Sequence, residues 1–300
     1  MAKWTKEEEG NLRVAIGQFY NNWEMVSGFV GTKSADSCEK KARREGWKAN
    51  VNAVFECKAE LGVVEIERKP YEEKLYLPNE DKNVLVFSCT HIPFERPGYL
   101  EFLQKIKKKY NCKRIICNGD LVDEHGLSFH DHDPDGYSAG LEGSVAKRTL
   151  KSWIKAFPEM VLVIGNHDAR PMRVARKSGI PNRAIKTLNE MWDLPDSWQW
   201  AFKIQLNGVI YKHGGGGKYP YANAAYNHSM SCVTSHAHSV MGISYHANEE
   251  KKWWGMGIGS GLNDKTYAME YGRDFDRKSI IGCGVVLNQG KTPILELMDL

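Results

Sequence analysis

The chain has 300 residues, of which 42% are hydrophobic and 26% are charged, and its formal net charge is +4 at pH 7. This length and hydrophobic fraction exclude a disordered chain and predict one large domain or two smaller ones, while the mild charge permits nucleic-acid binding without requiring it. No apolar run approaches the roughly 20 residues that span a bilayer, no signal segment opens the chain, and the seven scattered cysteines indicate free thiols, so we expect a cytoplasmic protein without membrane contact.

The first part of the chain predicts a small all-α domain. Thr5 and Glu8 have the spacing of a capping box, which satisfies backbone amides at the start of a helix. A second helix is expected over residues 23–30, and Ser34 has the position of an N-cap for a third helix over residues 35–44. Three short helices with a turn before the third fit a helix-turn-helix. We therefore divide the chain into a helical module (1–60), a linker (61–81) and a main domain (82–300).

The third expected helix carries four basic side chains, which are Lys40, Lys41, Arg43 and Arg44. On a recognition helix they would neutralise DNA phosphates, whereas on a helix that packs or binds protein they would form a solvated surface. The Trp-Thr-Lys-Glu-Glu opening, the second tryptophan Trp23 and the run 33–38 resemble Myb/SANT-type repeats. Because such repeats bind DNA in some proteins and protein in others, both interpretations stay open.

The main domain contains five strand-like apolar runs, and each is followed by Cys, Asp, Asn or His. The runs and the residues after them are 84–87 with Cys89 and His91, 114–117 with Asp120 and Asp123, 161–164 with Asn166 and His167, 211–212 with His213, and 233–234 with His236 and His238. A helix that begins near Pro97 separates the first two runs, and this order places two strands side by side. A further helix is expected over residues 144–157, and short strands of a second sheet over residues 198–300. Open α/β sheets place their chemistry at the carboxyl ends of strands, so these runs predict a metal site built from distant residues.

These motifs resemble the calcineurin-like metallophosphoesterases, whose pattern is Asp-x-His, Gly-Asp-x-x-Asp, Gly-Asn-His-Asp/Glu, a later His and Gly-His-x-His. The stretches 128–135 and 165–171 resemble the phage-encoded branch, which implies the host cytoplasm as the compartment. Two residues depart from the pattern, because Cys89 stands where the family has its first aspartate and Ser235 replaces the glycine before the His-x-His pair. The resemblance implies an α/β fold, a β-sandwich flanked by helices (αββα), preceded by the small all-α module.

The resemblance also implies two divalent metal ions (Mn, Zn, Fe or Mg) that neutralise the phosphate and hold a hydroxide between them for attack. One ion would be bound by Cys89, His91, Asp120 and His238, and the other by Asp120, Asn166, His213 and His236. His167 would act as the general acid toward the leaving oxygen, with its ring held by Asp123. Arg170 and Arg173 are candidates for binding the phosphate, and Asp168 is expected to be a structural hydrogen-bond partner.

The expected function is a metal-dependent phosphodiesterase or nuclease that acts on DNA, with the helical module holding the substrate. A phosphomonoesterase acting on nucleotides, nucleic-acid ends or phosphoproteins is the alternative, and an inactive body that only binds DNA or protein is a third possibility, favoured by Cys89. That cysteine could bind metal as a thiolate or could be a small apolar residue at a strand end. The loop with His130, Asp131, His132 and Asp133 is expected to face the substrate, with a further metal cluster as the alternative. No oligomeric state is indicated.

Overall fold

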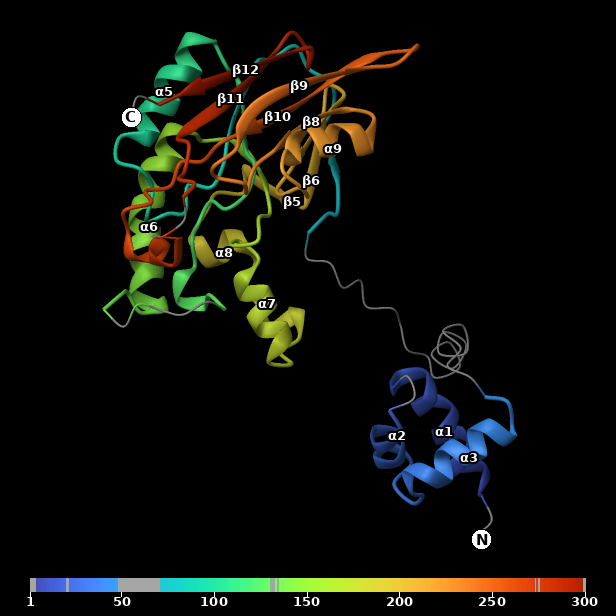
Figure 1. Ribbon diagram of the computed structural model, residues 1–300. Coiled ribbons are helices and arrows are strands. Elements are labelled where there is room, and N and C mark those ends of the chain that lie inside the picture. The colour runs from blue at the N-terminus through green and yellow to red at the C-terminus, as the bar shows by residue number, and fades with distance from the viewer. Residues whose placement is uncertain are drawn as a thin grey trace. The chain divides into compact units, whose positions relative to one another are not determined.

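The computed structural model describes residues 4–19, 22–47, 71–129, 133, 135–272, 274 and 276–298, and the chain divides into two compact units (Figure 1). The expected boundary between residues 60 and 61 lies outside the described residues. The same holds for His130, Asp131 and His132 of the expected polar loop. Within the described residues, no helix is both long and apolar enough to cross a membrane.

The described part of the N-terminal unit is helical, as expected, with helices α1 (Lys6–Phe19), α2 (Trp23–Val30) and α3 (Ala35–Arg44). The capping box is present, because Thr5 N donates to Glu8 Oε2 (2.8 Å) and Glu8 N donates to Thr5 Oγ1 (3.1 Å). Asn22 and Ser34 cap the next two helices through their side chains. The core consists of Leu12, Ala15, Ile16, Val26, Val30, Cys38 and Ala42, with Trp4, Trp23 and Trp47 packed against it.

Two stacked sheets form the centre of the second unit. Among the described residues, the first sheet has the order β12-β11-β2-β3-β4-β5 and the second the order β1-β6-β7-β8-β10-β9. The strands of the first sheet are β2 (Val84–Phe87), β3 (Arg114–Cys117), β4 (Met160–Val163), β5 (Trp198–Ala201), β11 (Gly282–Leu287) and β12 (Thr292–Leu297). The strands of the second are β1 (Leu75–Tyr76), β6 (Lys203–Leu206), β7 (Val209–Lys212), β8 (Ser231–Thr234), β9 (Met241–Ala247) and β10 (Lys252–Ile258).

Helices cover the outer face of each sheet, which gives the expected αββα layering. Side chains alternate along β2: Leu85 and Phe87 pack under the helices, whereas Val84 and Val86 pack between the sheets. The first sheet is covered by α5 (Tyr99–Lys109), α6 (Ala139–Ala156) and α8 (Leu188–Trp192), and the second by α9 (Pro220–His228). The remaining helices are α7 (Arg170–Lys177), η1 (His125–Leu127), η2 (Asn182–Ala184) and η3 (Tyr267–Gly272).

Three details of the main domain differ from the expectations. Strands β5, β11 and β12 join the first sheet, so residues 198–300 do not form the second sheet alone. Helix α6 begins at Ala139 and not at 144, because Ser138 caps it and offsets the cost of glycines in its first turns, which is about 1 kcal/mol each. Residues 71–81 of the expected linker pack on this unit, where β1 pairs with β6 and Glu80 binds Arg114 through two hydrogen bonds.

Strand direction brings the predicted motifs to one edge of the sandwich. Strands β2, β3 and β4 are parallel neighbours in the first sheet, and β7 and β8 are parallel neighbours in the second. The carboxyl ends of parallel neighbours meet at the same edge of a sheet. The loops after these strands therefore meet, although the first and the last of them are more than a hundred residues apart in the chain.

Candidate metal centre

The backbone at this edge is held in conformations that non-glycine residues rarely adopt. Cys89, His91, Asp120 and His236 have φ angles of 49°, 51°, 56° and 75°. Left-handed backbone at such residues costs roughly 1–2 kcal/mol each and is concentrated at functional sites. Gly165 allows the approach of β4, because a Cβ there would lie 2.1 Å from Asp120 Oδ1. Any larger residue at position 165 would clash with Asp120, so the fold requires glycine here.

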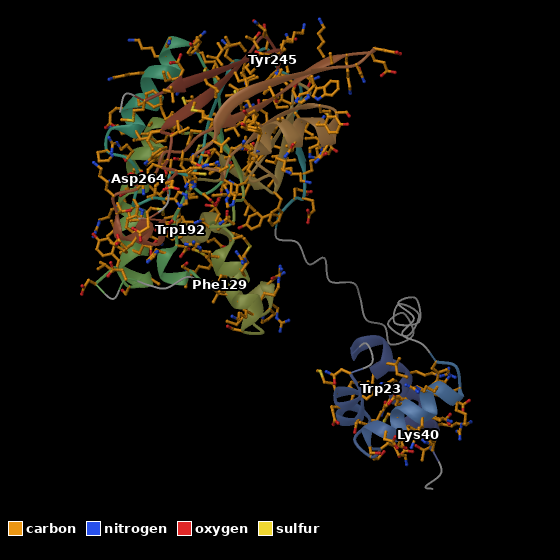
Figure 2. All side chains as sticks on the ribbon, in the orientation of Figure 1. Trp23, Lys40, Phe129, Trp192, Tyr245 and Asp264 are labelled. Carbon is orange, nitrogen blue, oxygen red and sulfur yellow. The ribbon has the colours of Figure 1, made fainter. Side chains whose placement is uncertain are left out.

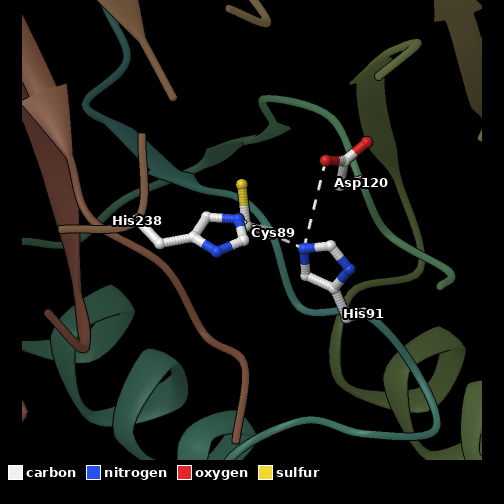
Figure 3. Close-up of side chains that lie close together, drawn as sticks. All are labelled: Cys89, His91, Asp120 and His238. Atoms are coloured by element: carbon white, nitrogen blue, oxygen red, sulfur yellow. Dashed lines mark hydrogen bonds and ion pairs between the residues drawn. The ribbon is translucent and has the colours of Figure 1, made fainter. Parts of the chain in front are cut away.

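Cys89, His91, Asp120 and His238 form the first group of possible ligands (Figure 3), and their ligand atoms lie within 4.8 Å of one another. His91 Nε2 lies 3.3 Å from His238 Nε2 and 4.0 Å from Asp120 Oδ2. His91 Nδ1 lies 2.6 Å from Asp123 Oδ1 and donates its proton to it. That bond leaves the Nε2 lone pair directed at the group, which is the arrangement of a metal-binding histidine with an orienting carboxylate.

Asp120, His213 and His236 form the second group, with Asn166 beside them. His213 Nδ1 donates to the carbonyl of Asn118 (3.0 Å), so its Nε2 carries a lone pair when the ring is neutral. That Nε2 lies 3.0 Å from Asp120 Oδ2, 3.0 Å from Asn166 Oδ1 and 3.3 Å from His236 Nδ1. These lone pairs point at one another, and a cation between them would remove their repulsion.

Asp120 belongs to both groups and is fully buried. Among the described residues its Oδ2 has no partner with hydrogen-bond geometry. A buried carboxylate oxygen without a donor is costly, and divalent ions bound by nitrogen, oxygen and sulfur ligands remove that cost. The donor set therefore fits two divalent cations that share Asp120.

The ionised carboxylate of Asp120 is buried, which also favours bound cations at this site. Burial opposes ionisation of Asp120, yet the imidazoles of His213 and His167 hold its pKa well below the ordinary value. Burial and the Asp120 carboxylate raise the pKa of Asp168 to about 6. Burial also lowers the pKa values of His236 and His238, so these rings stay in the neutral form that binds metal.

His167 lies next to the ligand groups but is held differently. Its Nδ1 donates to the carbonyl of Asp123 (2.8 Å) and lies 3.0 Å from Asp123 Oδ1. Its Nε2 lies 3.2 Å from Nη2 of Arg170, whose Nη1 donates to the carbonyls of Asp123 and Glu124. Burial opposes the charge on the His167 ring, but Asp120 and Asp123 raise its pKa above the ordinary value. Because a guanidinium N–H can only donate, Nε2 accepts from Arg170 in this arrangement, and it can carry a proton to a substrate only once that contact opens.

Residues 82–272 match the calcineurin-like phosphoesterase family, and this region is more than half of the chain. The chain belongs to the calcineurin-like phosphoesterase family. The predicted fold class is thereby confirmed together with the family. No curated protein sequence matches the chain.

Several solved structures resemble this chain at low identity. They are Vacuolar Protein Sorting 29 from Cryptosporidium parvum (14% identity, TM-score 0.39, covering 73% of this chain and 91% of that one), the phosphoesterase YfcE from E. coli (13%, 0.35, 72% and 100%) and the nuclease MPE from Pseudomonas putida (13%, 0.31, 70% and 87%). Likeness at this level carries no argument about substrate.

Asp168 positions Asp120, the residue common to both groups of possible ligands, in keeping with the structural role expected for it. Its Oδ2 accepts from the amides of Gly165 (2.9 Å) and Asp120 (2.8 Å), and its Oδ1 accepts from those of Leu121 (3.0 Å) and Val122 (3.4 Å). These bonds fix the left-handed backbone of Asp120. Asp168 is therefore a positioning residue and lies outside both ligand groups.

Other residues that support the candidate site were not assigned that role from the sequence. Ser235 donates to the carbonyl of Asn118 (2.6 Å), the same carbonyl that orients His213. Glu142 on α6 accepts from the amides of His125 and Gly126 and fixes the loop after Asp123. The one sequence feature that pointed to such a residue was Ser235, which replaces the glycine of the family pattern.

The two arginines expected to bind phosphate lie in different surroundings. Arg170 is buried and bonded to backbone carbonyls, as described above. Arg173 lies one turn further along α7, where its guanidinium carbon is 5.0 Å from the centre of the Phe129 ring. Only the first of them therefore adjoins the general-acid candidate His167.

The expected DNA-binding cations of α3 all pair with carboxylates of the same unit. Lys41 is buried, and its Nζ lies 2.6 Å from Glu9 and 3.0 Å from Glu45. The other three pairs are Lys40 with Asp36, Arg43 with Glu39 and Arg44 with Glu45, in which the cationic side chains are 69–78% exposed. Exposed pairs contribute about 0–1 kcal/mol, so these three cations can exchange partners, whereas Lys41 packs within the unit.

Proposed function

We propose that this phosphoesterase is a binuclear-metal-dependent phosphodiesterase that acts on DNA. The observation that carries the proposal is Asp120, whose buried Oδ2 faces both ligand groups without a hydrogen-bond donor. Cys89, His91, Asp120 and His238 would hold one ion, and Asp120, Asn166, His213 and His236 the other. Bound there, divalent ions neutralise phosphate charge and generate a nucleophile from water at neutral pH.

The residues of the chain then orient the substrate and move the proton. Asp123 holds the rings of His91 and His167 through one carboxylate oxygen, so one residue aligns a ligand with the proton donor. A proton on His167 Nε2 would pass to the leaving oxygen as the ester bond breaks. Because Arg170 Nη2 lies at that nitrogen, the substrate has to enter between the two side chains, where the guanidinium can bind a phosphate oxygen.

Charge beside the site supports a diester polymer as substrate. Residues 169–189 contain six basic residues and no acidic one. This stretch begins immediately after the general-acid candidate and its neighbour Asp168. A small phosphomonoester would not need cations beyond the site itself, whereas a polynucleotide carries a phosphate at each residue.

The test compares bis-p-nitrophenyl phosphate, p-nitrophenyl phosphate and plasmid DNA as substrates, each with Mn²⁺ or Zn²⁺ added. We expect hydrolysis of the diester and nicking of DNA, both abolished in Asp120→Asn. Hydrolysis of p-nitrophenyl phosphate alone would establish the phosphomonoesterase alternative. A folded, metal-loaded chain that cleaves none of the three would establish the inactive binding protein.

The N-terminal unit enters the proposal as a DNA-holding module, which stays a prediction, as do the helix-turn-helix resemblance and the phage branch. Its residues 4–47 carry seven basic and seven acidic side chains, so this described part supplies no net positive charge to attract phosphate. Deleting residues 1–60 tests the module directly. Weaker binding of duplex DNA by the truncated chain, with unchanged hydrolysis of the small diester, would support the prediction.

A further inference from the structure

Helix α7 and the segment after it form a basic arm, which we define as residues 170–186. It contains Arg170, Arg173, Arg176, Lys177, Arg183 and Lys186. Arg173, Arg176 and Lys177 are exposed, and none of them has a carboxylate partner within the described part of the chain. This contrasts with α3, where each cation is paired. Unpaired cations concentrated on one short helix indicate a surface for a polyanion.

The arm is connected to the catalytic residues at its first residue. Arg170 is bonded to the carbonyls of Asp123 and Glu124 and lies beside His167. Each further helical turn advances about 5.4 Å away from the site. Arg173 stands in the next turn, and Arg176 and Lys177 in the one after it. A strand whose scissile phosphate lies at His167 can therefore continue along this row of cations.

An exposed aromatic ring stands against the same helix. Phe129 is 51% exposed, and the guanidinium of Arg173 and the ammonium of Lys177 lie 5.0 Å and 5.3 Å from its ring centre. Figure 2 shows Phe129 beside α7. The ring and Arg173, Arg176 and Lys177 line a surface hollow of about 440 Å³. The loop that carries Phe129 begins at Asp123, so ring and helix are both tied to the site.

We propose that the basic arm and Phe129 bind single-stranded nucleic acid next to the catalytic centre, which rests on the proposed phosphodiesterase function and specifies its substrate. Arg173, Arg176 and Lys177 bind successive phosphates, and Phe129 stacks on an unpaired base. Single strands expose base faces to aromatic side chains, and every base can stack in this way. In a duplex these faces are covered by neighbouring bases, so a half-exposed ring beside the cation row would find no base face to stack on.

The test measures binding by fluorescence anisotropy with the full chain and a fluorescein-labelled oligonucleotide, in EDTA so that turnover does not intervene. The probes are a mixed-sequence single-stranded DNA, the same sequence as RNA, and the DNA duplex. We expect Phe129→Ala to weaken single-strand binding about 10-fold, in line with the loss of one stacked base. Arg176→Ser with Lys177→Ser should lower the slope of log K against log salt by about 1.4, since each single-strand phosphate contributes about 0.7.

Matched controls come from the same unit. Tyr245 is 73% exposed on β9, and Lys105 and Lys108 are exposed on α5, which lies at the other end of this unit from α7 (Figure 1). Tyr245→Ala, and Lys105→Ser with Lys108→Ser, remove an exposed aromatic ring and the same amount of charge elsewhere. Binding should stay close to wild type in both. The single strand, DNA or RNA, that loses more affinity in Phe129→Ala identifies the source of the ligand.

Several results would overturn the inference. Unchanged binding in Phe129→Ala would show that the ring does not stack, and an equal loss for duplex and single strand would make the arm a general phosphate contact. Asp131, Asp133 and Asp135 follow Phe129 in the sequence. If these aspartates neutralised the arm, the Arg176 and Lys177 variant would keep the wild-type salt slope. Since binding is measured without hydrolysis, none of these results depends on the wild-type diester assay, which tests the proposed function separately.

Discussion

Replacing Asp168 by asparagine tests whether the site depends on a residue outside both ligand groups. The carboxylate accepts four backbone amides, two on each oxygen. Asparagine keeps one acceptor oxygen and turns an amino group toward the other two amides. Two of the buried backbone N–H groups then face the side-chain amino group of asparagine, which is itself a donor. The left-handed backbone of Asp120, with φ 56°, loses part of what holds it.

Two energy terms oppose each other in this variant. Loss of two hydrogen bonds to a charged acceptor costs about 3–6 kcal/mol at 1.5–3 kcal/mol each. Asparagine also removes a buried charge: a pKa raised from 3.8 to about 6 means that ionised Asp168 costs the fold about 3 kcal/mol at neutral pH. The two terms cancel at the low end of this range, so we expect a net loss of at most about 3 kcal/mol. At about 2–4 °C per kcal/mol, Tm falls by at most about 12 °C.

The effect on metal binding should exceed the effect on stability. Mutation of a residue that orients a metal ligand typically lowers metal affinity by about 10–100-fold. Asp120 belongs to both ligand groups, so loss of its geometry would affect both. The assay is isothermal titration with Mn²⁺ and Zn²⁺, with Asp196→Asn as the control because Asp196 is exposed. A folded Asp168→Asn chain with wild-type metal affinity would refute the reasoning, since Asp120 would then hold its geometry without these bonds.

Three further predictions concern single residues. His167→Ala should lower turnover about 10²–10⁴-fold on DNA and less on p-nitrophenyl esters while metal content stays unchanged, and loss of metal would contradict its role. Cys89→Ala should lose one ion and Cys89→Asp should shift preference from Zn²⁺ toward Mn²⁺ in titrations, unless Cys89 only packs. Hydrogen bonds from Thr32 and Thr5, with the charge of Lys33, lower the pKa of Glu8 from 4.5 to about 2. Its stabilisation is therefore complete above pH 4.5 and lost toward pH 2. The extra hydrogen-exchange protection of residues 4–19 in wild type over Glu8→Gln should fade across that range, and a constant difference would disprove the assignment.

Much of the architecture was predictable because its signals are local. The start of α3 follows from the cap at Ser34, and strands β2, β3 and β4 follow from short apolar runs. The parallel pairing of β2 and β3 follows from a strand, helix and strand in sequence. The family motifs then placed candidate ligands at the strand ends.

Membership of the two sheets was not predictable in the same way. Strand β11 pairs with β2, almost two hundred residues earlier, and a strand's own residues do not encode that choice. The supporting contacts at the site have the same character. Ser235 and Asn118 are 117 residues apart, and Glu142 acts on a loop 16–17 residues away. Sequence patterns identify residues that carry chemistry, whereas residues that orient them are recognised only once the chain is folded.

The contrast between α3 and α7 shows why local charge alone does not locate a polyanion site. Both helices are short and rich in lysine and arginine. On α3 the charges alternate with acids at helical spacing, and Lys41 is buried against Glu9 from another helix, 32 residues away. On α7 the nearest acidic residues in the sequence are Asp168 and Glu190, and Asp168 is already bonded to four backbone amides. The unpaired cations of α7 therefore favour a polyanion along this helix, which begins three residues after His167.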